Sequence, residues 1–166
     1  MRGGAIASRV AIRPARSPQD IEDAAALFAA YADALGLDLT FQGFADELAT
    51  LPGRFAPPTG ELFLAHDAGG APVGCVALRA IAPDGCCEMK RLYVAPEGRG
   101  AGLGAALIAT AVARATTLGY REMRLDTLPS MQAVLALYRA AGFTTIEAYY
   151  PTPIPDTVFL AKRLRG

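Results

Sequence analysis

The sequence predicts an α/β fold in which a central sheet of about seven strands, mostly antiparallel, is flanked by about four helices. Short apolar runs of strand length alternate with segments whose apolar residues recur at helical spacing. Turn signals join three of the strand-like runs in succession, which favours hairpins. At 166 residues the chain can bury one sizeable core. We therefore expect a single domain over residues 8–166, preceded by a flexible tail at 1–7.

The expected elements follow the order strand, two helices, three strands, helix, strand, helix and two strands. The helices are expected over 18–35, 39–51, 103–118 and 131–140, and the strands over 9–14, 61–66, 72–81, 86–94, 122–127, 143–147 and 157–164. No internal repeat, low-complexity tract or interdomain linker interrupts this order.

Local signals define the first third of the chain. Ser17 followed by Pro18 is typical of a helix start, with serine as the N-cap and proline in the first turn. Gly36 is expected to end this helix. After the second helix, the Pro/Gly-rich stretch 52–60 is the longest segment without a predicted element. Such loops are where mobile lids tend to occur.

The remaining elements have equally local signals. The turns at 67–70 and 83–85 are suited to antiparallel hairpins between the three central strands. The next helix carries its apolar residues on one stripe and ends at Gly119. The last helix is expected to lie between Ser130 as its cap and Gly142.

Composition narrows the classes of partner. The formal net charge is zero and the basic residues are dispersed, so the sequence lacks the one-signed patch that nucleic acid or an anionic membrane demands. We expect a small-molecule partner. Cys75, Cys86 and Cys87 lack metal-ligand spacing and are expected to be reduced core residues, with no metal bound. No signal peptide or membrane-spanning run is recognised, which predicts a cytoplasmic protein.

A glycine-rich segment, Arg99-Gly100-Ala101-Gly102-Leu103-Gly104, separates a strand-like run from an Ala/Leu-rich helix. Glycines allow a ligand to approach the backbone closely, and the first turn of a helix presents unpaired N–H groups and a positive dipole end. Arg99 adds a planar set of donors suited to phosphate oxygens. The segment therefore predicts a diphosphate site.

Two blocks around this segment resemble the GCN5-related N-acetyltransferase (GNAT) superfamily. In residues 88–104, Arg99, Gly102 and Gly104 occupy the three defining positions of the motif that holds the pyrophosphate of acetyl-coenzyme A. A second block, 136–143, resembles the later Leu-Tyr-x-x-x-Gly-Phe pattern of the superfamily. The resemblance implies the acyl-CoA N-acyltransferase fold with its mixed sheet, and an acetyl-CoA-dependent N-acetyltransferase that works by direct transfer in a ternary complex. A homodimer is an expectation at the level of the family.

The resemblance also implies a set of coenzyme contacts. Backbone groups at the end of the strand before the glycine-rich segment would bind the pantetheine arm. Met131 stands where many members carry a coenzyme-binding asparagine, so Ser130 or Gln132 would have to substitute for it. The expected coenzyme-binding residues are Leu92, Tyr93, Val94, Arg99, Gly100, Ala101, Gly102, Leu103, Gly104, Ser130 and Gln132.

Glu88 is the candidate general base. It lies eleven residues before Arg99, the spacing at which histone-type members of the superfamily carry a catalytic glutamate. Burial on an apolar strand raises the pKa of a carboxyl group toward neutrality, where a general base works best. The alternative is a structural ion pair with Lys90 or Arg91. With a small amine, Glu88 would act through a water or simply hold the ammonium group.

Tyr138 is the candidate general acid. It occupies the tyrosine of the second motif, where the superfamily often protonates the coenzyme A sulfur, although a core role is the alternative. The single histidine, His66, is interpreted as a solvated turn residue and not as a catalytic group.

The acceptor site is less well defined by the sequence. A stiff aromatic and proline loop begins at Tyr149 and Tyr150, and with Tyr31, Asp38, Thr40 and Phe41 it is expected to line the pocket for the acceptor. The resemblance implies that the acceptor is a primary amine of a small molecule, peptide or protein.

The sequence also offers two alternatives to acetyl transfer. The Gly100-x-Gly102-x-x-Ala105 spacing also matches a dinucleotide fingerprint. However, five residues separate it from Val94 and several hairpin strands precede it, unlike a first βαβ unit. A non-catalytic coenzyme A-binding regulatory module is the other alternative. The presence of both Glu88 and Tyr138 argues for catalysis.

Overall fold

A computed structural model describes residues 10–36 and 43–165 of the chain. Its centre is a seven-stranded sheet with the order β1-β2-β3-β4-β5-β7-β6. Among the described strands, only the β4–β5 pair is parallel, so the expected mixed and mostly antiparallel sheet is confirmed. The strands are β1 Ala11–Pro14, β2 Glu61–His66, β3 Pro72–Ile81, β4 Cys86–Val94, β5 Glu122–Thr127, β6 Thr144–Ile146 and β7 Val158–Arg163.

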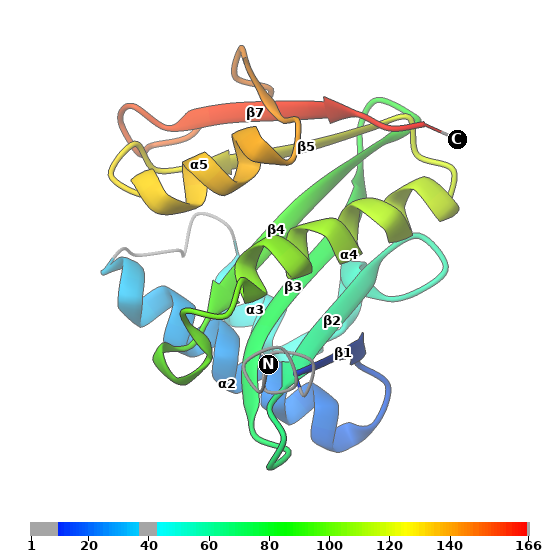
Figure 1. Cartoon of the computed structure of the whole chain (residues 1–166). Helices are drawn as coiled ribbons and strands as arrows, with labels where there is room; N and C mark the ends of the chain where they lie inside the picture. Colours follow the sequence, from blue (N-terminus) through cyan, green and yellow to red (C-terminus); the bar gives the residue numbers. More distant parts are fainter. Residues whose placement is uncertain (1–9, 37–42, 166) are drawn as a thin grey trace.

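Helices cover both faces of this sheet (Figure 1). On one face, α4 lies across the strands β2 to β4 and α5 lies beside β5 and β7; α2 and α3 pack on the other face. The α-helices are α2 Pro18–Leu35, α3 Phe44–Thr50, α4 Leu103–Thr117 and α5 Gln132–Ala140, with short 3₁₀ helices η2 Gly53–Phe55 and η3 Pro96–Gly98.

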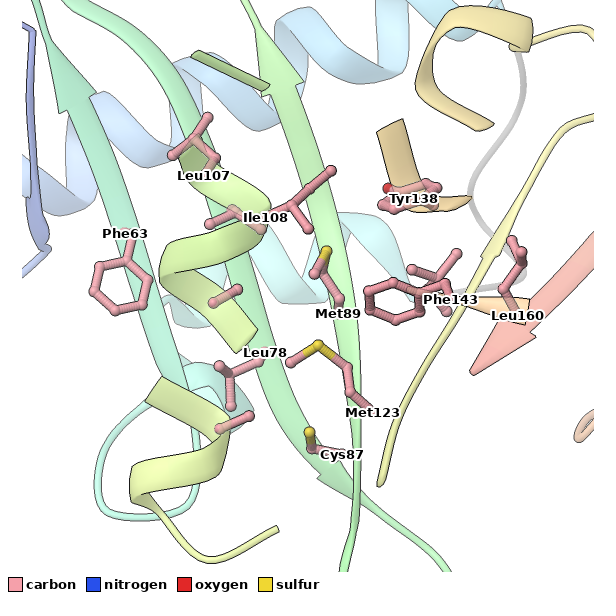
Figure 2. Close-up of a cluster of buried hydrophobic side chains, with 14 of the residues drawn as sticks. Phe63, Leu78, Cys87, Met89, Leu107, Ile108, Met123, Tyr138, Phe143 and Leu160 are labelled. Atoms are coloured by element: carbon pink, nitrogen blue, oxygen red, sulfur yellow. The ribbon is translucent and has the colours of Figure 1, made fainter. Parts of the chain in front are cut away.

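The larger core lies under α4 and α5. Leu107 and Ile108 of α4 meet the β-strand residues Phe63, Leu78 and Met89, and all of these side chains are buried (Figure 2). The same cluster continues across β5 to Tyr138 and Phe143, whose rings are 5.8 Å apart. Burial of these apolar faces contributes most of the free energy that holds α4 and α5 on the sheet.

A smaller core fixes α2 on the opposite face. Phe28 of α2 and Phe55 of η2 are both buried, and their rings meet edge to face at 6.1 Å. The stretch 52–60 was expected to be an unstructured, lid-like loop, and this prediction is wrong: it contains η2 and contributes Phe55 to the core. Burial of the apolar Phe55 side chain fixes this stretch on the sheet, although its Pro/Gly composition is typical of an unstructured loop.

Strands β4 and β5 separate along their length, as Figure 1 shows. They pair only over Cys86–Glu88 and Glu122–Arg124, although both strands continue further. A register shift between β3 and β4 accompanies this separation, with Arg91 in the left-handed region at φ 61°. The result is a gap in the middle of the sheet between the second half of β4 and the end of β5.

The helix ends follow the sequence signals with one exception among the described residues. Ser17 caps α2 in a capping box with Asp20, and Gly36 ends that helix in a left-handed conformation, as expected. Ser130 is not the cap of α5: the N-cap is Met131, without a side-chain hydrogen bond. For the helix expected over 39–51, the structure describes only Phe44–Thr50, and its expected first residues lie outside the described part.

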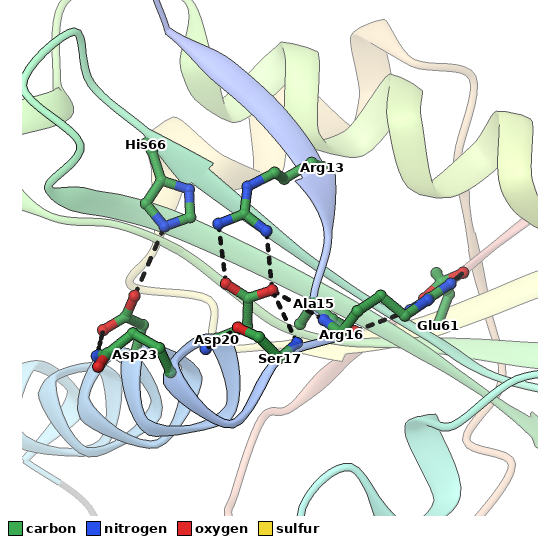
Figure 3. Close-up of polar contacts among 9 residues, drawn as sticks. Arg13, Ala15, Arg16, Ser17, Asp20, Asp23, Glu61 and His66 are labelled. Atoms are coloured by element: carbon green, nitrogen blue, oxygen red, sulfur yellow. Dashed lines mark hydrogen bonds and ion pairs between the residues drawn. The ribbon is translucent and has the colours of Figure 1, made fainter.

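A polar network joins β1, α2 and β2 (Figure 3). Asp20 is 2% exposed, and its two carboxylate oxygens accept hydrogen bonds from the Arg13 guanidinium at 2.8 and 2.9 Å. The N–H groups of Arg16 and Ser17 also donate to Asp20, and Arg16 pairs with the buried Glu61. These contacts hold the start of α2 against the edge of the sheet.

His66 corrects an expectation from the sequence. The sequence predicts a solvated turn residue, but His66 is only 8% exposed, with its Nε2 3.6 Å from Asp23 Oδ2. Helix α2 covers this end of β2, which the local sequence does not reveal. His66, Asp20 and Asp23 bring their donor atoms within 4.8 Å of one another. Because Arg13 already occupies both oxygens of Asp20, this group is a salt-bridge cluster.

The three cysteines are buried and unpaired, as the sequence predicted. Within the described residues, no helix combines the length and the apolar character needed to cross a membrane.

Candidate active site

A cavity of about 660 Å³ opens at the start of α4. It is walled by Tyr31 and Leu35 of α2, the end of β4, the turn before α4, and the segment that leads into α5. All of the expected coenzyme-binding residues line it except Ala101. Since these four segments meet at this cavity, it can enclose an elongated ligand.

The turn before α4 leaves its backbone accessible. Gly100 and Gly102 adopt positive φ values of 91° and 74°, and a Cβ at either position would meet nothing within 4 Å. Gly102 is the N-cap of α4, and the first hydrogen bond of the helix runs from Ala106 N–H to its carbonyl oxygen at 3.1 Å. The N–H groups of the first turn therefore face outward with the positive end of the helix dipole, an arrangement suited to an anion.

Gly104 has a different role in the same turn. A Cβ there would lie 2.9 Å from Leu137 Cδ1, so a larger residue would force the end of the Leu137 side chain on α5 to shift. Arg99 is exposed beside the cavity, and its Nε donates to the carbonyl oxygen of Val94 at 3.1 Å. This hydrogen bond leaves the terminal nitrogens of the guanidinium available for a ligand.

The gap between β4 and β5 holds a second, small cavity of about 30 Å³. We call it the inter-strand cavity. Tyr31, Lys90, Asp126, Met131 and Tyr138 are among the residues around it. Tyr31 and Met131 also line the large cavity, so the two spaces are adjacent. A long ligand held at the start of α4 can therefore extend to the gap in the sheet.

Tyr138 lies on α5 with its phenol against this gap. It is 6% exposed, and burial raises the pKa of its hydroxyl, so the group is a neutral donor at physiological pH. Among the described residues, its hydroxyl has no hydrogen-bond partner. The edge-to-face contact with Phe143 fixes the ring. The arrangement leaves one oriented donor free for a ligand.

Glu88 lies at the end of the paired part of β4, just before the gap opens. It is 2% exposed; Arg79 Nε donates to its Oε1 at 3.0 Å, and the Tyr149 hydroxyl donates to its Oε2 at 2.6 Å. The ion pair expected as the structural alternative therefore exists, but its partner is Arg79 and not Lys90 or Arg91. Each carboxylate oxygen can accept two hydrogen bonds, so Glu88 keeps capacity for another donor.

Glu88 faces a third cavity, of about 460 Å³, which we call the acceptor-side cavity. Its charged lining residues are Arg54, Arg79, Glu88 and Lys90, and its aromatic wall is Tyr149 and Tyr150. Both tyrosine rings pack on Phe159, at 5.2 and 5.4 Å, which fixes the wall. Lys90 lines this cavity and the inter-strand cavity, so it marks where the two meet.

The expected acceptor residues divide between these spaces. Tyr149 and Tyr150 line the acceptor-side cavity, while Tyr31 stands where the large and inter-strand cavities meet. Asp38, Thr40 and Phe41 lie outside the described residues.

Sequence reasoning missed Asp126, Lys90, Arg79 and Arg54. Asp126 accepts a hydrogen bond from the Tyr150 hydroxyl and shares the inter-strand cavity with Tyr138, which Glu88 does not. Burial, followed by this hydrogen bond, raises the pKa of Tyr150. Strand alternation was the one available signal, because it places Lys90 on the same face of β4 as Glu88.

Arg91 explains how α3 is held near the site. It is 4% exposed, and its guanidinium donates to both carboxylate oxygens of Glu47 on α3, at 2.8 and 3.0 Å. The same guanidinium lies over the rings of Tyr31 and Phe44. Arg91, at the bulge of β4, therefore contacts both α2 and α3 and holds them on this face of the sheet.

Comparison with known proteins gives one consistent result. The model of the acetyltransferase (GNAT) family matches residues 25–143. An uncharacterised N-acetyltransferase of Schizosaccharomyces pombe is 42% identical over 153 residues, which are 92% of this chain and 94% of that protein.

Solved structures agree in fold. An acetyltransferase of the GNAT family from Staphylococcus aureus has a TM-score of 0.77 at 17% identity, with 94% of this chain and 99% of that chain covered. A GNAT superfamily phosphinothricin acetyltransferase from Sinorhizobium meliloti, solved in complex with acetyl-CoA, has a TM-score of 0.70 at 24% identity, covering 94% and 89%.

Proposed function

The chain belongs to the GNAT family of acetyltransferases, and from this premise we propose that it transfers an acetyl group from acetyl-CoA to a primary amine in a ternary complex. The observation that carries the proposal is the glycine turn at the start of α4, which opens into a cavity that reaches Tyr138 through the gap between β4 and β5. The coenzyme and the acceptor would approach this gap from different cavities.

The residues around the large cavity fit the coenzyme. The open space over Gly100 and Gly102 and the outward N–H groups of α4 suit a diphosphate, with Arg99 beside it. Leu92 and Val94 line the large cavity in the part of β4 that β5 no longer pairs with, where backbone groups could meet a pantetheine arm. Ser130 and Gln132 line the far wall, where the Gln132 amide already donates to the Pro129 carbonyl oxygen.

Bound acetyl-CoA supplies a thioester whose carbon–sulfur bond breaks as the acceptor nitrogen bonds to the acyl carbon. Tyr138 donates a hydrogen bond to the departing sulfur, and its raised pKa makes it a donor whose proton is transferred late or not at all. Glu88 receives the proton that the acceptor nitrogen loses, through a water or through the Tyr149 hydroxyl bound to it.

Asp126 is the second candidate for the base. It faces the same small cavity as Tyr138, whereas Glu88 faces the acceptor-side cavity. The hydroxyl of Tyr150 orients its carboxylate. The variants Glu88→Gln and Asp126→Asn separate the two roles: the group that takes the proton shows the larger loss of kcat and a changed pH profile.

A direct assay tests the proposed function. Purified protein is incubated with acetyl-CoA and a panel of primary amines, while released thiol and acetylated product are measured together. We expect stoichiometric thiol release and N-acetyl product with at least one amine. Saturable coenzyme binding without turnover across the panel would contradict the proposal and favour a binding module.

Three expectations from the sequence stay predictions: a catalytic domain over residues 8–166, a cytoplasmic location and a homodimer. Light scattering on the purified chain, with and without residues 1–7, checks the domain boundary and the oligomeric state.

A further inference from the structure

We propose that the acceptor is an amine that also carries a carboxylate or a similar anionic group, which Lys90 and Arg54 bind in the acceptor-side cavity. This inference rests on the proposed function, because it names the class of the second substrate. The charged groups around the cavity carry it: three cations, Arg54, Arg79 and Lys90, face one carboxylate, Glu88.

Lys90 is the central observation. It is only 7% exposed, and no hydrogen bond or ion pair joins it to another described residue. Its ammonium nitrogen is not fully enclosed by protein, and the residue lines the acceptor-side cavity. A largely buried ammonium group without a direct protein partner is expected to bind a ligand there. Burial lowers the pKa of Lys90 while the Glu88 and Asp126 carboxylates oppose the shift. An anion bound beside Lys90 would favour its charged form further.

Arg54 supplies a second cation without a counterion. Its terminal nitrogen donates to the Ala80 carbonyl oxygen at 2.9 Å, and no described carboxylate pairs with it. The adjacent Phe55 is buried, which fixes the backbone of η2 and hence the base of this side chain. A guanidinium has five N–H donors, so most of them remain for a carboxylate.

Arg79 does not add to this excess, because Glu88 neutralises it. Two cations of the cavity lining, Arg54 and Lys90, are therefore left without a carboxylate partner in the lining. A polyamine or another purely cationic acceptor would be repelled, whereas an aminocarboxylate would be attracted. The charge of the cavity therefore favours an aminocarboxylate over a polyamine, a choice that the sequence alone does not make.

The location also fits an acceptor with two functional groups. Lys90 stands where the acceptor-side cavity meets the inter-strand cavity that Tyr138 lines. An acceptor whose anion binds Lys90 and Arg54 can place its amine toward the gap between β4 and β5. A volume of about 460 Å³ suits a small molecule of this kind.

The test compares matched acceptors. We would measure kcat/KM for a set of amino acids and other aminocarboxylates, each paired with its carboxamide and corrected for the fraction of free amine. The acid member of the preferred pair should be favoured by about 10-fold or more. Lys90→Met and Arg54→Gln should each lower kcat/KM for that acid by about 10- to 100-fold and change its amide by much less. Arg163→Gln, an exposed arginine outside the cavities, is the matched control and should leave the ratio unchanged.

The outcomes distinguish this inference from the proposed function. Equal or better use of the amides, or an unchanged acid-to-amide ratio in Lys90→Met, would overturn the inference and leave acetyl transfer intact. If no amine is turned over, the proposed function fails, and calorimetry with the acid members then decides the anion site. Binding that is lost in Lys90→Met supports the site, and no binding to the wild-type protein contradicts it.

Discussion

The cavity at the start of α4 and the acceptor-side cavity differ in how the chain builds them. The first is bounded largely by a few continuous stretches, 92–94, 98–105 and 128–137, and presents backbone groups and apolar side chains. The second collects charged and aromatic side chains from η2, β3, β4 and the loop after β6. A local motif therefore suffices for the coenzyme, whereas the acceptor is recognised by residues that only the folded sheet brings together.

The comparison predicts separable effects of mutation. Changes around the turn before α4 should act on coenzyme affinity, and changes around β4 should act on turnover and acceptor preference.

The largest expected effect is on turnover, from Glu88→Gln. This change keeps the shape of the side chain but removes its basicity, and loss of a general base typically costs about 10²- to 10⁴-fold in kcat. Coenzyme affinity should stay within about 2-fold. Glu61→Gln is the matched control, because Glu61 is equally buried and paired with an arginine but lies outside the cavities. A Glu88→Gln variant with wild-type kcat and pH profile would assign Glu88 to structure.

Tyr138→Phe should lower kcat by about 10- to 10³-fold with little change in coenzyme affinity, since its hydrogen bond to the sulfur forms mainly in the transition state. The loss is bounded because a thiolate, with a thiol pKa near 8.5, is already a tolerable leaving group. Tyr120→Phe is the control, since that hydroxyl donates to the Thr59 carbonyl oxygen and Tyr120 lines none of the three cavities. If kcat falls only to the extent that the melting temperature also falls, Tyr138 has a structural role in the core and no catalytic one.

Gly102→Val should weaken coenzyme binding by at least about 10-fold, because a side chain at φ 74° is strained and also fills the approach to the turn. Calorimetry measures this. Gly70→Val is a matched control, since Gly70 also has a positive φ, 87°, and open space around it but lies in the β2–β3 turn. Equal loss of coenzyme affinity in both variants would show that strain alone is responsible.

The smallest effect should come from a region that belongs to neither cavity. The Arg13 guanidinium lowers the pKa of the Asp20 carboxyl well below its usual range, and the backbone N–H groups of Arg16 and Ser17 act in the same direction. Because the pKa of Asp20 is lower in the folded state, its ionised carboxylate stabilises the fold. This contribution to the free energy of unfolding is complete above the unfolded pKa of about 3.9 and is lost as the pH falls below that value. Asp20→Asn should therefore lower the free energy of unfolding by about 1 to 2 kcal/mol at pH 7.

The difference in unfolding free energy between wild type and Asp20→Asn should shrink between about pH 4 and pH 2. Denaturant melts across this range measure it. A constant difference down to pH 2 would show that the network in Figure 3 does not act through the Asp20 charge.

The element order and the coenzyme turn could be predicted from sequence because their signals are local. Ser17, Gly36 and the glycines before α4 each act within a few residues of their own position. The burial of His66 could not be predicted, because it depends on α2, some forty residues earlier in the chain. The pairing of Glu88 with Arg79 likewise follows from the β3–β4 register.

The charge of the acceptor-side cavity could not be predicted from the sequence either, because it depends on residues that are distant from one another along the chain. The net charge of the chain is zero, and Arg54, Arg79 and Lys90 are dispersed in sequence. Only the packing of η2 against β3 and the face of β4 that carries Lys90 bring these cations together.

One calorimetric comparison tests the division between the two cavities most directly: titration of coenzyme A into the wild-type protein, Arg99→Ala and Lys90→Met. Loss of a charged hydrogen bond to phosphate should weaken binding to Arg99→Ala by about 10- to 100-fold, while Lys90→Met should bind within about 2-fold of wild type. Unchanged affinity in Arg99→Ala, or an equal loss in Lys90→Met, would contradict the account.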